Sequence, residues 1–275
     1  MGGVTTTNRR EVLRAGAALV AGGTLAAGCS AADASSHGAT AAPADSASGP
    51  AADPAPHRAS GPPPRPAAPA PRAFPGQPGQ LTHGPRDRPR LALTFHGQGD
   101  PALARELLTT VEKRGARITV LAVGTWLDEH PDLAHRILDG GHDLGNHTQR
   151  HIAVNTLAEA DARTEITACA DRLKRLTGSI GTWFRPSRAP TASPLVARLA
   201  HAAGYPHVLS YDVDSLDYTR PGAPAVTRKV LAEARGGSVV SLHFGYPDTV
   251  AALPAVLNEL DRRGLRAVTT TELLS

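Results

Sequence analysis

The ten residues HDLGNHTQRH, numbered 142–151, place two histidines directly after a short strand pattern. His142–Asn146 is typical of a buried strand, and His147 and His151 follow it. Two histidines four residues apart lie on one face of a helical turn, so both imidazoles can reach one ion. Imidazole suits zinc, and also cobalt or nickel. The stretch therefore predicts a metal-binding pair, although an H-x-x-x-H pair taken alone is more often two surface histidines.

The same alternation of strand and helix extends to both sides of this stretch. Seven short apolar runs are strand candidates: Arg90–His96, Arg117–Val123, His142–Asn146, Thr182–Arg185, His207–Val213, Ser238–Phe244 and Arg266–Thr270. Amphipathic helical stretches lie between them, among them Leu157–Leu176, Leu195–Ala203, Ala225–Ala234 and Ala252–Arg263. This alternation predicts one α/β domain with a largely parallel sheet over residues 90–275. Because seven strands are fewer than a regular barrel needs, we expect a distorted, incomplete (β/α) barrel.

Polar side chains end or follow five of the strand candidates. These residues are His96, His147, Arg185, Asp214 and His243. In barrels of parallel strands, the chemistry collects at the carboxyl ends of the strands. The sequence therefore predicts one functional site at that end of the barrel.

Residues 1–28 have the features of an export signal and are left out of the fold. Asn8–Arg14 contains Arg-Arg and resembles a twin-arginine signal, and a weakly apolar run, Ala15–Ala27, follows it. That run is about half the ~20 residues that a membrane span needs. Leu25–Cys29 resembles a bacterial lipobox, in which the cysteine is lipidated. We expect a lipoprotein held at the outer face of the cell membrane through Cys29.

Residues 29–89 are expected to form a disordered linker. Of the sixty residues from 30 to 89, 30 are Ala or Pro, a composition that cannot bury enough surface to offset chain entropy. Cys29 and Cys169 are the only cysteines of the chain, which excludes a disulfide framework and a cysteine-based zinc site. The formal net charge is only +4. Binding of nucleic acid needs clustered basic residues, and the composition does not indicate a basic face, so nucleic acid is not expected as a partner.

Four stretches carry a resemblance to a known family. They are HTQRH at His147–His151, FRPSRA at Phe184–Ala189, YDVDSLDY at Tyr211–Tyr218 and VSLHF at Val240–Phe244. In order and spacing, they resemble the motifs H-[ST]-x-x-H, R-x-P-x-G or R-P-P-Y-G, D-[ST]-x-D-W and L-x-H. These motifs belong to the NodB-homology polysaccharide deacetylases, carbohydrate esterase family 4. The stretch Phe184–Ala189 lacks the Tyr-Gly end of its motif, and the stretch Tyr211–Tyr218 has Tyr in place of Trp.

The first motif of that family, T-F-D-D-G, departs in this chain, which reads Thr94-Phe95-His96-Gly97. Family members use the first Asp as general base and the second as a metal ligand. His96 could serve as the base, because its ordinary pKa suits proton transfer at neutral pH. His96 could instead join His147 and His151 in a three-histidine metal site. As a third alternative, Asp100 could supply the carboxylate, although Asp before Pro is also a helix N-cap signal.

The resemblance implies metal-dependent hydrolysis of acetyl groups, chiefly N-acetyl, on an envelope polysaccharide such as peptidoglycan. The divalent metal would be zinc, with cobalt or manganese as alternatives, held by His147 and His151. His243 would protonate the leaving amine, with Asp217 (or Asp214) holding it, and Arg185 would lie beside His96. The rival hypothesis is a catalytically inactive, glycan- or wall-binding lipoprotein, because both carboxylates of the first motif are replaced.

Overall fold

The computed structural model describes residues 67–275. The predictions for the signal segment, for Cys29 and for the linker up to residue 66 lie outside the described residues. The strands are β1 (Gln80–Leu81), β2 (Arg90–Gly97), β3 (Thr119–Ala122), β4 (Asp143–Asn146), β5 (Val208–Leu209), β6 (Val213–Asp214), β7 (Val239–His243) and β8 (Arg266–Val268). The helices are α1 (Pro101–Lys113), α2 (Gly124–Glu129), α3 (Pro131–Asp139), α4 (Glu159–Thr177), α5 (Pro194–Ala202), α6 (Ala223–Glu233), α7 (Pro247–Arg262) and α8 (Thr270–Leu273), with 3-10 turns η1 (Val154–Thr156) and η2 (Asp217–Thr219).

The strands form a curved sheet in which every ladder is parallel. The main path runs β4-β3-β2-β7-β6, and β8 also pairs with β2. Phe184 bridges Asn146 of β4 and Val208 of β5, so the sheet continues to the β5-β1 pair. Among the described strands no ladder joins β1 to β6, which leaves the sheet open there. The predicted α/β fold, a distorted and incomplete (β/α) barrel, is confirmed.

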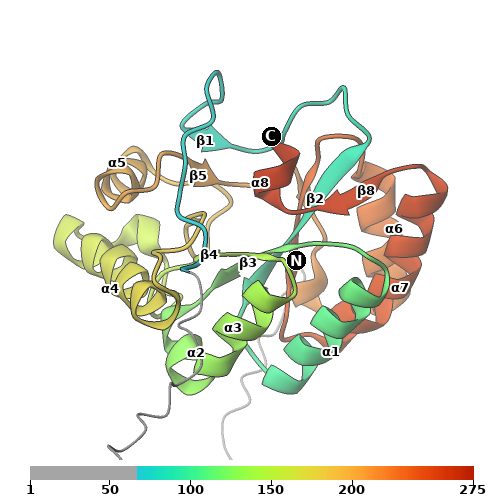
Figure 1. Cartoon of the computed structure of the whole chain (residues 1–275), viewed down its shortest axis with the longest axis horizontal. Coiled ribbons are helices and arrows are strands. Elements are labelled where there is room, and N and C mark those ends of the chain that lie inside the picture. Colours follow the sequence, from blue (N-terminus) through green and yellow to red (C-terminus); the bar gives the residue numbers. More distant parts are fainter. Residues whose placement is uncertain (1–66) are drawn as a thin grey trace, which may run out of the picture. The chain divides into compact units, whose positions relative to one another are not determined.

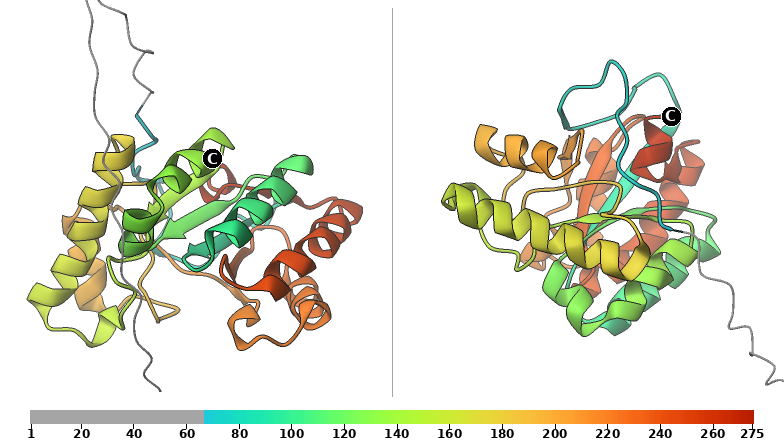
Figure 2. Two further views of the ribbon diagram at one scale, coloured as in Figure 1. Left: turned by 90° about the horizontal axis from the view of Figure 1, so that it is seen from below. Right: turned by 60° about the vertical axis from the view of Figure 1, so that its left-hand side comes forward.

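Helices cover the outer face of this sheet (Figures 1 and 2). Around it, α6 packs on α7, α7 on α1, α2 on α3, α3 on α4 and α4 on α5. The central strand β2 is buried from Leu91 to Gly97, as expected for a parallel strand covered on both faces. No helix among residues 67–275 is both long enough and apolar enough to span a membrane. Cys169 lies buried on α4 as a free thiol.

Two of the predicted strands do not form as single continuous strands. The run Thr182–Arg185 contributes only the bridge residue Phe184. The run His207–Val213 divides into β5, which pairs with β1, and β6, which pairs with β7. The run divides because its two ends pair with different partners on opposite sides of the open sheet.

Part of the stretch predicted as linker, residues 74–81, packs against the domain. The Phe74 ring stacks on Trp183, with centroids 5.5 Å apart and planes 10° apart. The Phe74 backbone N–H donates to His207 Nε2 at 2.9 Å, and Leu81 of β1 is 1% exposed. Stacking of Phe74, burial of Leu81 and the pairing of β1 with β5 together attach residues 74–81 to the domain.

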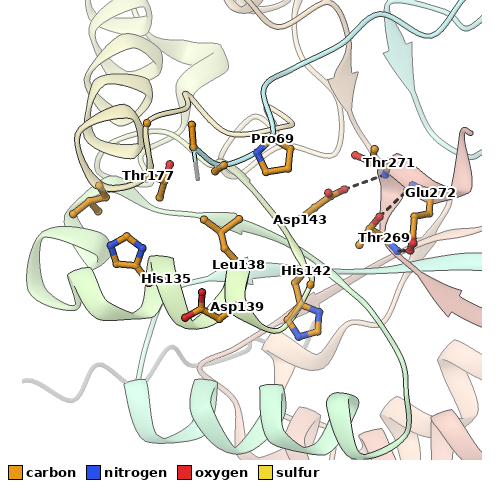
Figure 3. Close-up of a pocket in the computed structure, with 15 residues that line it drawn as sticks. Pro69, His135, Leu138, Asp139, His142, Asp143, Thr177, Thr269, Thr271 and Glu272 are labelled. Atoms are coloured by element: carbon orange, nitrogen blue, oxygen red, sulfur yellow. Dashed lines mark hydrogen bonds between the residues drawn. The ribbon is translucent and has the colours of Figure 1, made fainter. Parts of the chain in front are cut away.

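A cavity of about 650 Å³ lies near the amino end of β4 (Figure 3). Asp143 borders it, and its carboxylate accepts hydrogen bonds from Trp183 Nε1 at 3.1 Å and from the Thr271 backbone N–H at 3.0 Å. Burial raises the pKa of Asp143. These bonds tie β4 to α8, so Asp143 has a structural role at this end. The candidate catalytic residues lie at the other end of the strands.

Candidate functional site

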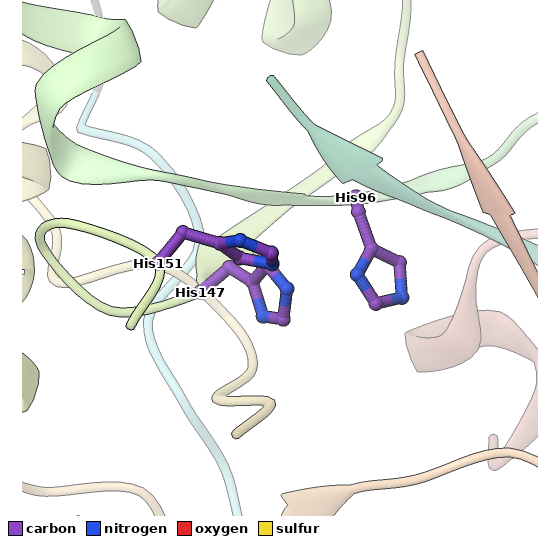
Figure 4. A group of neighbouring side chains, drawn as sticks. All are labelled: His96, His147 and His151. Atoms are coloured by element: carbon purple, nitrogen blue, oxygen red, sulfur yellow. The ribbon is translucent and has the colours of Figure 1, made fainter. Parts of the chain in front are cut away.

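Three histidines meet at the carboxyl ends of β2 and β4 (Figure 4). His96 is the penultimate residue of β2, His147 directly follows β4, and His151 lies in the loop beyond. One ring nitrogen from each lies within 4.8 Å of the others. The His96 and His147 ring centroids are 4.4 Å apart, and those of His147 and His151 are 4.8 Å apart. This arrangement could hold one metal ion.

His147 is oriented as a metal-binding histidine would be. Its Nδ1 lies 3.0 Å from the carbonyl oxygen of Arg185. Because a carbonyl only accepts, Nδ1 carries the ring hydrogen and Nε2 keeps a lone pair. Nε2 is buried and has no hydrogen-bond partner in the described structure. A buried acceptor without a partner is costly, and a metal ion would satisfy it.

The loop His147–His151 is not the helical turn that its spacing predicts. Thr148 and His151 have φ angles of 68° and 55°, in the left-handed region. The loop is fixed from outside, because the Arg150 backbone N–H and Nε donate to the buried carboxylate of Glu165 on α4, at 2.8 and 2.6 Å. Contacts with α4 therefore replace helical hydrogen bonds, and the two imidazoles converge through a strained loop.

His96, rather than Asp100, completes the cluster. The Asp100 carboxylate accepts from the Ala102 backbone N–H at 2.8 Å and caps α1, so the N-cap prediction is confirmed. His96 Nδ1 is buried without a partner, whereas its Nε2 lies 3.0 Å from Ser241 Oγ. At Gly97, an added Cβ would lie 2.9 Å from the side chain of Val120 on β3. Position 97 therefore has no room for a carboxylate ligand.

All three imidazoles are held in the neutral form. Burial, followed by the neighbouring His147, lowers the pKa of His96 well below its ordinary value. Burial and then His151 lower the pKa of His147 in the same way. Burial and then Arg188 lower the pKa of His151 to about 4. Neutral imidazoles carry the lone pairs that a metal requires.

A buried carboxylate holds a fourth histidine beside the cluster. Asp217, in η2, is fully buried, and its Oδ1 lies 2.6 Å from Nδ1 of His243 at the end of β7. Its Oδ2 accepts from the His243 backbone N–H at 2.8 Å and from Thr249 Oγ1 at 2.6 Å. The alternative, Asp214, instead accepts from the Leu216 backbone N–H. Asp217 is thus the residue that orients His243.

Arg185 is a fully buried cation beside His96. Its Nε and Nη2 donate to the carbonyls of Leu209 and Ser210 at 3.1 and 3.0 Å. Its Nη1 lies 3.4 Å from His96 Nε2. Burial lowers the pKa of Arg185 to about 10, so the guanidinium stays charged at neutral pH. As expected, the cation contributes to the low pKa of His96.

His96, His151 and His243 line a cavity of about 570 Å³. Its walls combine imidazoles, tyrosines and few charges: His96, Gln98, His151, Arg188, Ala189, Pro190, Tyr211, Asp214, Tyr218, Ser241, His243 and Tyr246. Tyr218 and Tyr246 each lie 5.6 Å from the His243 ring, edge to face. Trp126 and Trp183, the two tryptophans of the chain, do not line this cavity and are core residues, 5% and 2% exposed.

Two residues of the site, Ser241 and Tyr246, were not predicted from the sequence. Ser241 lies on β7, is 2% exposed and lies within hydrogen-bond distance of His96. The sequence did contain a signal for it, because Ser241 stands where the family motif L-x-H has Leu. Tyr246, three residues after His243, was missed as well and carried no motif signal.

Comparison with known proteins agrees with this geometry. Residues 83–208 match the polysaccharide deacetylase family. The chain is 30% identical over 194 residues to a peptidoglycan-N-acetylglucosamine deacetylase of Bacillus cereus, covering 69% of this chain and 90% of that protein. It is 27% identical over 195 residues to a chitooligosaccharide deacetylase of Bradyrhizobium, covering 62% of this chain and 84% of that protein.

Solved structures share the fold. A family 4 pseudoenzyme from Bacillus anthracis superposes with a TM-score of 0.68 at 22% identity, covering 72% of this chain and 70% of that one. A peptidoglycan N-acetylglucosamine deacetylase gives 0.67 at 24% identity, covering 71% and 92%. By its sequence and its fold, the chain belongs to the NodB-homology polysaccharide deacetylases of carbohydrate esterase family 4.

Proposed function

We propose that the chain is a metal-dependent deacetylase that hydrolyses acetyl groups, chiefly N-acetyl, on a cell-envelope polysaccharide such as peptidoglycan. The proposal rests on one observation, the cluster of three neutral imidazoles next to a cavity that His96, His151 and His243 line, with Asp217 holding His243. The chain's similarity to a peptidoglycan deacetylase supports the same substrate class.

The metal would be zinc, with cobalt or manganese as alternatives, and His96, His147 and His151 would hold it. Three protein ligands with one open position are typical of catalytic zinc. When bound, the ion supplies Lewis-acid polarisation of the acetyl carbonyl and activation of the attacking water. His96 is then a ligand, which accounts for its partnerless Nδ1.

Proton transfer to the leaving amine would belong to His243. Asp217 accepts at Nδ1, which leaves Nε2 of His243 for the cavity. Nε2 would first take up a proton, the Asp217 carboxylate would stabilise the resulting imidazolium, and the imidazolium would donate that Nε2 proton to the amine as the C–N bond breaks. The backbone N–H of Arg188, on the cavity wall, would stabilise charge on the acetyl oxygen.

A second candidate is an inactive glycan-binding lipoprotein. The observation that favours it is the loss of both first-motif carboxylates, at His96 and Gly97. Acetate release distinguishes the two functions, measured on peptidoglycan and acetylated chito-oligosaccharides after chelation and reloading with zinc, cobalt or manganese. We expect metal-dependent release. A metal-loaded protein that binds glycan without releasing acetate would support the second candidate.

We also propose that Cys29 is lipidated and anchors the exported chain to the outer face of the membrane. Cys29→Ala should leave an unprocessed precursor or a released protein, because the lipobox cysteine is the acylated residue. The measurement is incorporation of a labelled fatty acid together with membrane fractionation. Cys169→Ala is the matched control, since that thiol is buried in the domain. Unchanged mature mass and membrane association in Cys29→Ala would contradict the anchor.

A further inference from the structure

We propose that Ser241 selects the ring tautomer of His96 and so decides which nitrogen of His96 can bind the metal. The inference deepens the proposed function and rests on it. His96 Nε2 has two neighbours, Ser241 Oγ at 3.0 Å and Arg185 Nη1 at 3.4 Å. His96 Nδ1, the other ring nitrogen, has no partner. The hydrogen of the neutral ring must sit on one of these two atoms.

The two neighbours of Nε2 differ in the tautomers that they can accommodate. A guanidinium only donates hydrogen bonds, so Arg185 favours a lone pair on Nε2 and a hydrogen on Nδ1. A hydroxyl can donate or accept, so Ser241 is the one neighbour of the two that can accept from a hydrogen on Nε2, the tautomer with a lone pair on Nδ1. Only the second tautomer gives His96 a free lone pair on the nitrogen that has no protein partner.

The geometry assigns the hydrogen to Nε2. Ser241 Oγ is at ordinary hydrogen-bond distance, whereas 3.4 Å to Arg185 exceeds the usual range. Arg185 is also fixed by the carbonyls of Leu209 and Ser210, which hold its guanidinium in place. The opposite tautomer would bury an Nδ1–H with no acceptor, because no hydrogen bond joins it to His147 in the described structure.

Two departures from the family motifs, His96 in place of Asp and Ser241 in place of Leu, are therefore linked. A carboxylate at position 96 would accept from Arg185 and need no further partner. An imidazole there needs an acceptor for its second nitrogen, and Ser241 supplies one in place of the motif's Leu. The register of β2 with β7 pairs Thr94 with Ser241, so His96, two residues further along β2, shares a face with Ser241. Ser241 is thus a positioning residue for His96.

The first test reads the tautomer directly, without metal. The full chain, labelled with ¹⁵N-histidine and metal-free, is studied by two-bond ¹⁵N–¹H correlation, with the His96 signals assigned from His96→Gln. We expect Nε2–H in the wild type and in Ser241→Thr, and Nδ1–H in Ser241→Ala. Ser210→Ala is the matched control, since it removes a buried hydroxyl that has no hydrogen-bond partner next to Arg185.

The second test measures zinc affinity by calorimetry. Ser241→Ala should weaken zinc binding by about 10–100-fold, the usual effect of losing a partner that orients a ligand, and Ser241→Thr and Ser210→Ala should not. The inference is overturned if wild-type His96 carries its hydrogen on Nδ1, or if Ser241→Ala keeps the wild-type tautomer, even with weaker zinc binding. If the tautomer changes as expected but the wild type binds no zinc, the proposed metal site fails and the role of Ser241 stands.

Discussion

His147→Gln should lower the zinc affinity of the chain by more than about 10²-fold and abolish metal-dependent acetate release. Changes to residues that merely orient a ligand already cost about 10–100-fold, and loss of a ligand costs more. The His147 ring is buried with its Nε2 directed at no protein acceptor or donor, so no neighbouring group can replace it. Calorimetric titration with zinc measures the loss.

The matched control is His201→Gln, on an exposed position of α5. This variant should bind zinc as the wild type does. Thermal unfolding gives a second reading, because zinc stabilises only a protein that binds it in the folded state. The wild type and His201→Gln should gain thermal stability with zinc, and His147→Gln should not. Stoichiometric zinc retained by His147→Gln would place the metal site elsewhere.

Asp217→Asn should lower kcat by about 10²–10⁴-fold, the range expected for loss of a general acid–base group. The Asp217 carboxylate accepts from His243 Nδ1 at 2.6 Å and so keeps Nε2 facing the cavity. An amide at that position can donate to Nδ1 instead, which favours the wrong tautomer of His243. Acetate release at saturating substrate measures kcat.

Zinc affinity in Asp217→Asn should stay close to that of the wild type, because Asp217 contacts His243 and not the three-histidine cluster. Asp214→Asn is the control, since its carboxylate lies on the cavity wall and accepts from the Leu216 backbone N–H rather than from a histidine. Wild-type turnover in Asp217→Asn, with zinc bound, would show that the pair has no part in proton transfer.

Strands with a buried apolar run could be read from the sequence, and short edge pieces could not. The runs at β2, β3 and β7 were predicted because each strand packs a largely apolar stretch into the core. The runs at β4 and β8 were predicted as well, although within them only Leu144 and Val268 are large apolar side chains that are buried. β1 was missed, because two residues in an Ala/Pro-rich context give no periodic signal. The packing of Phe74 could not be predicted either, because it depends on stacking with Trp183, a residue far away in the chain.

The candidate site was predictable as a set of residues but not as a geometry. The predicted site residues lie at or just after the carboxyl ends of predicted strands, so the parallel sheet alone brings them to one end of the barrel. These residues are His96, His147, Arg185 and His243. The loop shape at Thr148 and His151 depends on Glu165 of α4, a contact that no local pattern encodes. Similarly, the contact between β2 and Ser241 of β7 requires the register of two strands far apart in the chain.

The close packing around Gly97 limits which side chains this position can accommodate. A Cβ at that position would lie 2.9 Å from Val120 Cγ1 and 3.1 Å from the Ala122 Cα. Restoring the two-aspartate pattern therefore requires more than new side chains at positions 96 and 97, because Val120 or the β3 backbone must also shift to make space. A smaller residue at position 120 would supply that space. The choice of ligands at the end of β2 is thus coupled to the size of a side chain on the neighbouring strand.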